Sequence, residues 1–415
     1  MTHIPLTRRD ALIAGADFLP TLGSYAQRRN HVEPLHRNVS RLSAALRYRL
    51  LLEDEVVHDT LRTHEFRAVE KWLQEVCWRR YWKGWLEMRP DVWTSWRRRV
   101  RELTETLPEA VMQRAREVEA GGSGVACMDA IARELIATGY LHNHARMWWA
   151  SYWIHVERLP WELGADVFFC HLLDADPASN TLSWRWVAGL QTPRKTYLVR
   201  LSNIEKYAPE ILLHNPAGSE RIADGTVSPT VATDFADTVR RALPDYPAEV
   251  PRGDRRVGLW LHSDDLLSEA GPLANLTPVT VAAFSSEHNY RHDYALSERH
   301  LAALDDVLTD GLARAAAHFK CPTVLSKDAD PAASLCTWAA AHALDEVVAF
   351  APMIGPVADL VPRLRQLLTS AGITLTLLRR ASDADVFMLA GAGFFPFWEK
   401  MSRHLREQSS PAAAR

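Results

Sequence analysis

Hydrophobic residues recur at helical spacing through most of residues 1–235. In EFRAVEKWLQEVCWRRYWKGWLEM, residues 65–88, one stripe is formed by Val69, Trp72, Leu73 and Val76. This spacing predicts a helix with one buried face. Residues 123–156 predict two further helices that meet at Gly139, because glycine commonly ends helices. Strand-like alternation is scarce, so this half is predicted to be an all-α bundle.

The pattern changes after residue 243. Residues 244–256, PDYPAEVPRGDRR, are rich in proline and charge and predict a linker. Beyond it, short apolar runs rich in β-branched residues occupy 257–262, 278–284, 322–326, 346–352 and 373–379, with helical patterns at 298–319 and 357–372. Alternating strands and helices predict a parallel sheet of Rossmann-like or flavodoxin-like type. We therefore expect a helical domain over 1–243 and an α/β domain over 257–415.

Composition excludes several broad classes of protein. With 415 residues, of which 47% are hydrophobic and 24% charged, the chain can form two domains with substantial cores. Its net charge of −3 gives no global signature of nucleic-acid binding, so such a surface must be local. The five cysteines are scattered without metal-ligand spacing and are expected to be reduced thiols. No membrane span or signal peptide is predicted, and we expect a cytoplasmic protein. We also expect no metal site.

The stretch DADPASNTLSWRW, residues 174–186, combines acids, a carboxamide and two indoles. Asp174, Asp176 and Asn180 are spaced like ligands of a calcium loop, but its turn glycine and closing glutamate are missing. A carboxylate pair would also suit glycoside hydrolysis. Alternatively, the acids cap helices and the tryptophans fill a core. These residues by themselves leave the three interpretations open.

Three upstream segments also join polar groups to aromatic residues. They are NVSRLSAALRYRL (38–50), KWLQEVCWRRYW (71–82) and GYLHNHARMWWASYW (139–153). With 174–186 they contain, in order, S-R-L-S, W-x-x-E-x-x-W-R, G-(aromatic)-x-H-N-x-x-R-M and D-x-D-x-x-x-N-x-x-x-W-x-W. This set resembles the FAD-binding domain of the photolyase/cryptochrome family. The resemblance covers about residues 25–207, which is most of the helical half.

The resemblance implies which side chains would bind FAD. They are Tyr25, Ser40, Arg41, Leu42, Ser43 and Arg79 at the phosphates; Trp72 at the pocket wall; Asn143 and Arg146 beside the isoalloxazine; Asp174 as the partner of Arg146; Asp176 near the ribityl and adenine groups; and Asn180 at flavin N5. Such groups would hold the cofactor and tune its redox state.

The resemblance also divides the tryptophans between electron transfer and substrate binding. Trp184 matches the indole that donates an electron to photoexcited FAD, and Trp161 matches the next relay residue. For the third relay position the substitutes are Trp148, Trp149, Trp153 and Tyr152, with core packing as the alternative for each. The expected catalytic and lesion-contacting residues are Glu75, Trp78, Asn143, Met147, Asn180 and Trp186. Flat indole faces suit a flipped-out pyrimidine dimer.

The expected function is blue-light-driven repair of cyclobutane pyrimidine dimers in UV-damaged DNA by electron transfer from reduced FAD. The alternative is a cryptochrome-like photoreceptor that uses FAD photoreduction to signal to a partner protein, without repair. His142 and His144 flank Asn143 and would suit acid catalysis of (6-4) repair, whereas Met147 favours the cyclobutane version.

The sequence departs from the family in the order of its halves. The antenna-type α/β domain usually comes first, whereas here it follows the FAD motifs, which looks like a circular permutation. A second, antenna chromophore (folate or deazaflavin) finds no matching residues, and a purely structural domain is the alternative. A local DNA surface is expected from Arg79, Arg80, Lys83, Arg97, Arg98, Arg99, Arg101, Arg194 and Lys195. For residues 97–101, an exposed charged helix face is the alternative.

Overall fold

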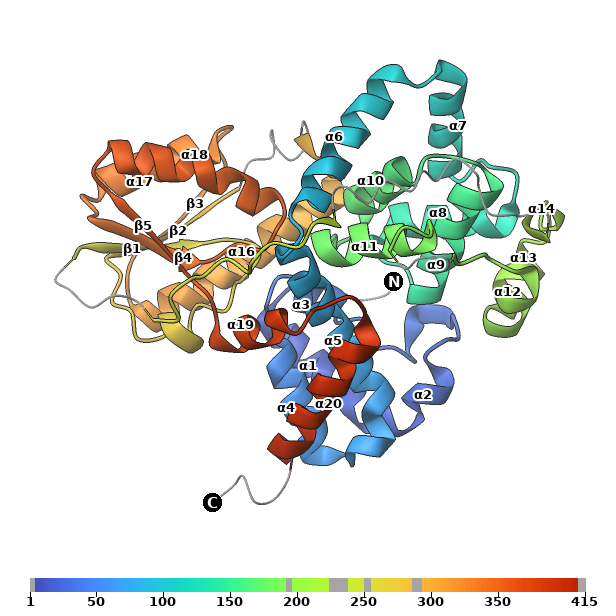
Figure 1. Ribbon diagram of the computed structural model, residues 1–415, viewed down its shortest axis with the longest axis horizontal. Helices are drawn as coiled ribbons and strands as arrows, with labels where there is room; N and C mark the ends of the chain where they lie inside the picture. Colours follow the sequence, from blue (N-terminus) through green and yellow to red (C-terminus); the bar gives the residue numbers. More distant parts are fainter. Residues whose placement is uncertain (1–3, 192–195, 224–237, 250–254, 286–292, 410–415) are drawn as a thin grey trace.

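A helical half and a half built on one parallel sheet lie side by side (Figure 1). The computed structural model describes residues 4–191, 196–223, 238–249, 255–285 and 293–409. Helices come first along the chain and the sheet second, as predicted. Within the described residues, we find no helix with the length and apolar character that a membrane crossing requires. Nor does this part of the chain gather histidine, cysteine and acidic side chains into a metal-binding group.

Among the helices of the first half, α5 contacts α2, α4 and α11. The helices of this half are α1 (Arg8–Phe18), α2 (Tyr25–Arg28), α3 (Ser43–Arg47), α4 (Glu53–Thr63), α5 (Phe66–Glu87), α6 (Asp91–Thr106), α7 (Glu109–Glu119), α8 (Ala126–Thr138), α9 (Asn143–Ser151), α10 (Trp161–His171), α11 (Pro177–Val187), α12 (Leu201–Tyr207), α13 (Pro209–His214) and α14 (Glu220–Ala223). The apolar stripe predicted on α5 is buried, with each of its four residues at most 5% exposed. Helix α8 ends at Gly139, whose φ of 68° is left-handed, which confirms the predicted break.

The second half is a five-stranded sheet in which all neighbouring strands are parallel. The strands are β1 (Val257–Leu261), β2 (Thr280–Phe284), β3 (Thr323–Ser326), β4 (Glu346–Phe350) and β5 (Thr374–Leu378), in the order β3-β2-β1-β4-β5. Each strand lies within one of the five apolar runs, so the parallel sheet is confirmed. The connecting helices are α16 (Glu298–Phe319), α17 (Pro331–Ala341) and α18 (Pro356–Ser370).

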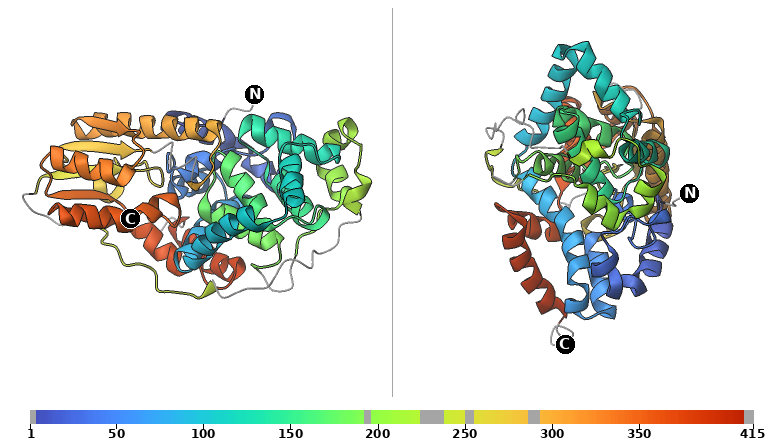
Figure 2. Two further views of the ribbon diagram at one scale, coloured as in Figure 1. Left: turned by 90° about the horizontal axis from the view of Figure 1, so that it is seen from above. Right: turned by 90° about the vertical axis from the view of Figure 1, so that its right-hand side faces the viewer.

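Helices cover both faces of the sheet (Figure 2). Leu259 and Leu261 of β1 join a core that includes α16 and continues into the helical half. Trp260, between them in sequence, faces the other way into a separate core with α17 and α18. This alternation follows from the two-residue period of a strand. One sheet face therefore shares its core with the helical half.

The chain after β5 returns to the helical half. Helix α19 (Ala381–Met388) packs closely on α5, because a β-carbon on Gly84 would lie 2.7 Å from the Cα of Phe387. Helix α20 (Phe394–Ser409), drawn in red, runs beside α4 and α5 (Figure 1). The elements after residue 380 thus cover the helical bundle, while the division at residues 244–256 stays a prediction.

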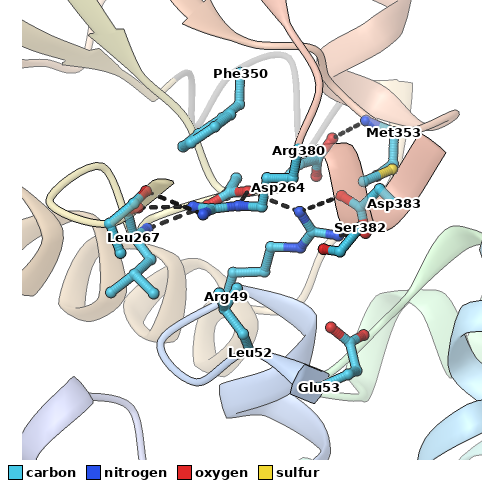
Figure 3. A network of polar contacts seen from close by, with 12 residues as sticks. Arg49, Leu52, Glu53, Asp264, Leu267, Phe350, Met353, Arg380, Ser382 and Asp383 are labelled. Carbon is cyan, nitrogen blue, oxygen red and sulfur yellow. Dashed lines mark hydrogen bonds and ion pairs between the residues drawn. The ribbon is translucent and has the colours of Figure 1, made fainter. Parts of the chain in front are cut away.

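Buried ion pairs join the two halves (Figure 3). Arg49 donates to Asp265 and to Asp383, each at 2.8 Å. Arg380 donates to both oxygens of Asp265, again at 2.8 Å. All four side chains are at most 7% exposed. The carboxylate of Asp265, which follows β1, thus binds Arg49 of the helical half and Arg380 of the segment after β5.

Candidate functional site

The loop before α11 places two buried carboxylates against two arginines. Asp174 accepts hydrogen bonds from Nη1 of Arg146 at 3.1 Å and 3.0 Å. Asp176 accepts from Nη1 of Arg79 at 3.2 Å. Asp176 also caps α11, because its other oxygen accepts from the backbone N–H of Ser179 at 2.7 Å. The segment 174–176 therefore contacts α5 through Arg79 and α9 through Arg146, and it leads directly into α11.

The electrostatics of this pair favour ionised carboxylates. Burial opposes ionisation of Asp176, but Arg79, Lys83 and Arg47 outweigh it and lower its pKa to about 2. Burial likewise opposes ionisation of Asp174, yet Arg146 and Arg79 lower the pKa of this carboxyl too. A buried opposite charge stabilises the charged form of an acid. Both acids therefore remain anions at neutral pH.

Aromatic rings pack around Trp72 of α5. The ring centroid of Trp72 lies 5.3 Å from that of Tyr25 and 5.4 Å from that of Phe18. The indole N–H of Trp72 donates to Oγ1 of Thr60 at 3.0 Å. Beside these rings is a hollow lined by Trp72, Leu42 and residues of α1 and α4. Trp72 therefore lies at the wall of a hollow, while the roles of Tyr25 and Leu42 at the phosphates stay predictions.

The segment 40–43 turns sharply before α3. Arg41 has a φ of 57°, in the left-handed region that non-glycine residues rarely adopt. The backbone N–H of Leu42 donates to Oγ of Ser40 at 3.4 Å. Nε of Arg41 is buried without a hydrogen-bond partner among the described residues. A buried donor left open in this way calls for a partner that the protein chain does not supply.

Asn180 and Trp184 lie one turn apart on α11 and face inward. The amide of Asn180 donates to the carbonyl of Ala165 at 2.8 Å, so α10 fixes its orientation. Trp184 is 2% exposed, and its indole N–H has no partner within the described residues. Trp161 begins α10, and the guanidinium of Arg185 lies 6.0 Å from its ring centroid.

The α5 residues expected at the lesion cavity contact other parts of the chain. Glu75 pairs with Arg29, while burial raises the pKa of this carboxyl against the effect of the arginine. Trp78 stacks on Phe394 of α20, with ring centroids 3.6 Å apart and planes 8° apart. One face of Trp78 is therefore already covered by the C-terminal helix.

The remaining lesion-contact candidates lie nearer the surface. Asn143 is exposed, and its amide nitrogen lies 3.7 Å from Sδ of Met147. Trp186 is half-buried and stacks on Tyr197, with centroids 5.6 Å apart. The described ring contacts do not join Trp186 to Trp78. Trp78 and Trp186 thus have different aromatic neighbours, and their shared stacking site stays a prediction.

Comparison with known proteins identifies the helical half. Residues 72–211 match the family model for the FAD binding domain of DNA photolyase. This part of the chain is therefore similar to the FAD-binding domain of DNA photolyases, and its relatives are named photolyases and a cryptochrome. The match runs from Trp72 through α13 and includes Asp174, Asp176, Trp184 and Trp186.

Individual relatives match only part of this chain. A deoxyribodipyrimidine photo-lyase of Escherichia coli is 29% identical over 205 residues, 47% of this chain and 42% of that protein. Cryptochrome-1 of Arabidopsis thaliana is 42% identical over 69 residues, 17% of this chain and 10% of that protein. The chain thus spans less than half the length of these curated relatives. A class III photolyase structure from Agrobacterium tumefaciens gives a TM-score of 0.44 at 23% identity, covering 56% of this chain and 54% of that one.

The photolyase-type site fits FAD in the chemistry of its donors. Arg41 and Trp184 carry buried N–H groups without partners in the described residues. The hollow beside Leu42 and Trp72 is lined mostly by apolar residues. Arg79 and Arg146 supply cations at the other side of the site. Together these are the polar anchors and apolar walls typical of a cofactor site.

Buried ion pairs engage three cations of the expected DNA surface. Arg80 pairs with Asp54, Lys83 with Glu53, and Arg97 with Asp166, and all three cations are at most 8% exposed. Arg98 and Arg99 pair with Glu102 on the same exposed helix face. This supports the alternative that part of the run 97–101 is an exposed charged helix face. Arg194 and Lys195 lie outside the described residues. Arg80, Lys83 and Arg97 are therefore engaged within the fold, and a DNA surface from the exposed cations stays a prediction.

Sequence reasoning did not identify Arg47 and Phe394 as part of the site. Arg47 lies four residues after the S-R-L-S segment and contributes to the low pKa of Asp176. Phe394 lies in the segment AGAGFFPFWEKM, whose aromatic residues were the available signal. Its contact with Trp78 depends on the return of α20 to α5, which local sequence does not reveal.

The sheet half offers a separate hollow. It is small and is lined by Trp260, His262 and Phe284 together with residues of α17 and α18. It lies beyond the carboxyl ends of β1 and β2, where open parallel sheets commonly bind ligands. The antenna chromophore stays a prediction for this half.

Proposed function

We propose that this protein repairs cyclobutane pyrimidine dimers in DNA, using blue light and reduced FAD. The observation that carries the proposal is the pairing of Arg79 with Asp176 and Arg146 with Asp174 at the head of α11. The same helix then carries Asn180, Trp184 and Trp186. Cofactor anchors and substrate-facing aromatic residues thus share one rigid element, which favours accurate positioning.

When bound, FAD supplies the light absorption and the transferred electron. The chain's own residues would hold it, with Ser40–Ser43 and Arg79 toward the phosphates and Asn143, Arg146 and Asn180 toward the ring system. The Asp174 and Asp176 carboxylates keep these arginines oriented. Glu75, whose pKa is raised by burial, would donate a hydrogen bond to, or share a proton with, a base carbonyl. Met147 and Trp186 would bound the lesion from α9 and α11.

A direct test uses purified protein saturated with FAD and chemically reduced without oxygen. It is mixed with an oligonucleotide that contains one thymine dimer, in single-stranded and double-stranded form, under blue light and in darkness. Light-dependent loss of the dimer supports the proposal. Bound, photoreducible flavin without dimer loss would reject repair of this lesion.

Trp186→Ala should weaken binding of the lesion and leave flavin absorbance unchanged. Loss of one base-stacking indole costs about 1–3 kcal/mol, or roughly 5- to 150-fold in affinity. Fluorescence anisotropy with damaged and undamaged oligonucleotides measures this difference. Trp186→Phe, which retains a stacking face, should recover part of the affinity. Equal loss of flavin and lesion binding in Trp186→Ala would place this indole in the cofactor wall.

A second candidate function is a blue-light photoreceptor that signals to a partner protein. Two observations favour it: Phe394 covers Trp78, and the cations Arg80, Lys83 and Arg97 are engaged in internal ion pairs. Both reduce the surface available to a flipped-out lesion and its phosphates. Under this function, light would change the flavin and the oligomeric or partner-bound state, with damaged and undamaged DNA bound equally.

A further inference from the structure

The turn that leads from β4 into α18 reaches the helical half at the start of α11. Its last residue, Gly355, has a φ of 154° and a ψ of −166°, a conformation that is essentially restricted to glycine. A β-carbon on Gly355 would lie 2.6 Å from Cγ of Pro177 and 3.3 Å from its Cβ. Pro177 is buried and is the first residue of α11, directly after Asp176. The α/β half therefore contacts the chain beside a carboxylate that is predicted to bind FAD.

Two buried carboxylates, one from each half, bind the backbone of this turn. The N–H of Met353 donates to Oδ2 of Asp264, which follows β1, at 3.1 Å (Figure 3). The N–H of Ile354 donates to Oε1 of Glu87, the last residue of α5, at 2.8 Å. Arg379 donates to the other oxygen of Glu87 at 2.6 Å. Movement of the turn would therefore break hydrogen bonds to acceptors that are at most 4% exposed, which is costly for a buried carboxylate.

Arg47, the last residue of α3, connects the carboxylate that binds this turn to Asp176. Its guanidinium pairs with Asp264 at 2.8 Å, and both side chains are at most 8% exposed. Burial lowers the pKa of Arg47, but Asp264 and Asp176 outweigh it and raise this pKa above its ordinary value. The same guanidinium helps to keep Asp176 ionised. One buried cation is therefore attracted by a carboxylate from each half.

The turn also limits the access of water to the charges around Asp176. A small hollow between the halves is lined by Arg47, Lys83 and Asp176 on one side and by Met353 and Ile354 of the turn on the other. Lys83 and Arg47 both lower the pKa of Asp176. Charges interact more strongly where water is excluded. The side chains of the turn therefore strengthen the attraction that these cations exert on the carboxylate.

We propose that the turn 353–355 of the α/β half is a positioning element for FAD binding. It packs on Pro177 and holds Arg47 through Asp264, and both contacts fix the Asp176 carboxylate where it accepts a hydrogen bond from Arg79. The turn acts through Asp176 and not through contact with the cofactor. The inference rests on the proposed function only for FAD binding. Because coupling between two sites is reciprocal, bound FAD stabilises the turn as much as the turn favours FAD.

Gly355→Ala tests the contact with Pro177. FAD binding would have to restore the start of α11 against the added β-carbon, so the dissociation constant for FAD should rise by about tenfold. Gly372→Ala is the matched control in the same half, because Gly372 has a left-handed φ of 73° but its β-carbon would meet no atom of the described residues within 4 Å. This control should bind FAD as tightly as the unmodified protein. Titration of the cofactor-free proteins with FAD, followed by flavin fluorescence, measures the three affinities.

A compensating substitution distinguishes positioning from a general loss of stability. Pro177→Ala removes the Cγ atom that the new β-carbon would meet at 2.6 Å. The double variant Gly355→Ala with Pro177→Ala should therefore bind FAD about as tightly as Pro177→Ala alone. Equal weakening of FAD binding in Gly355→Ala and Gly372→Ala would overturn the proposal, as would a double variant that recovers no affinity.

Amide hydrogen exchange of the unmodified protein tests the same coupling without a variant. Saturation with FAD should slow exchange at Met353 and Ile354, followed in peptides that span the turn. Exchange at Gly372, whose N–H donates to the carbonyl of Thr369 at 3.0 Å, should stay the same. Unchanged exchange across the turn with FAD bound would overturn the positioning role. Absence of saturable FAD binding would reject this inference and the proposed function together, whereas FAD binding with protection of the turn but without dimer repair would reject only the proposed function.

Discussion

Replacing Asp265 by alanine should lower the free energy of unfolding by about 3–5 kcal/mol, because it leaves the buried Arg380 without a carboxylate and Arg49 with only one of its two. Arg49 and Arg380 both donate to this side chain, and each is at most 7% exposed. Asp383 still contacts Arg49, whereas Arg380 retains only backbone carbonyls as acceptors. Chemical denaturation of the variant and the unmodified protein measures the difference.

The matched control is Glu102→Gln, which removes the exposed partner of Arg98 and Arg99. Exposed pairs contribute little, so this variant should change stability by less than about 1 kcal/mol. Equal effects of the two substitutions would show that the junction between the halves does not depend on Asp265.

The same carboxylate predicts the acid sensitivity of the junction. Burial opposes its ionisation, but Arg380 and Arg49 lower the pKa of Asp265 below its ordinary value of 3.8. A lowered folded-state pKa contributes stability that is present above pH 3.8 and is lost as pH falls further. Between pH 5 and 2, the free energy of unfolding should therefore fall more steeply with decreasing pH in the unmodified protein than in Asp265→Ala.

Much of the fold was predictable because its periodicities are local. The five apolar runs became the five parallel strands, and residues 298–319 became α16 with the same bounds. The return of α19 and α20 to α5 was not predictable, because it depends on contacts between residues about 300 positions apart. The close approach at Gly84 is visible in the sequence only as a glycine within a helix.

The candidate site was partly predictable for a similar reason. The pairing of Arg146 with Asp174 follows from the resemblance and is present in the structure. The roles of Arg80, Lys83 and Arg97 were not predictable, because a cation's partner is set by three-dimensional packing. Their acidic partners Asp54, Glu53 and Asp166 lie on other helices. The sequence shows where the charged residues are, but it does not show which of them form ion pairs.

Substitution of Asp176 separates two functions of one side chain. Asp176→Asn retains the oxygen that caps α11 but removes the charge that faces Arg79. Asparagine and aspartate cap helices about equally well, whereas alanine costs about 1 kcal/mol more. Loss of the buried charge itself should cost about 1.5–3 kcal/mol in both variants, because it weakens a charge-assisted hydrogen bond. Thermal and chemical unfolding of Asp176→Asn and Asp176→Ala measures the separate contributions of the helix cap and of the charge.

The pH dependence gives an independent measurement of the charge. The pKa of Asp176 is lowered to about 2, so its stabilisation is present above the ordinary value of 3.8 and is lost as pH falls through 2. Both variants should lack this component between pH 4 and 2. Titration with FAD should show weaker binding in both variants, because Arg79 is no longer held in place. If Asp176→Asn binds FAD as tightly as the unmodified protein, the carboxylate serves the fold of α11 and the orientation of Arg79 must come from another group.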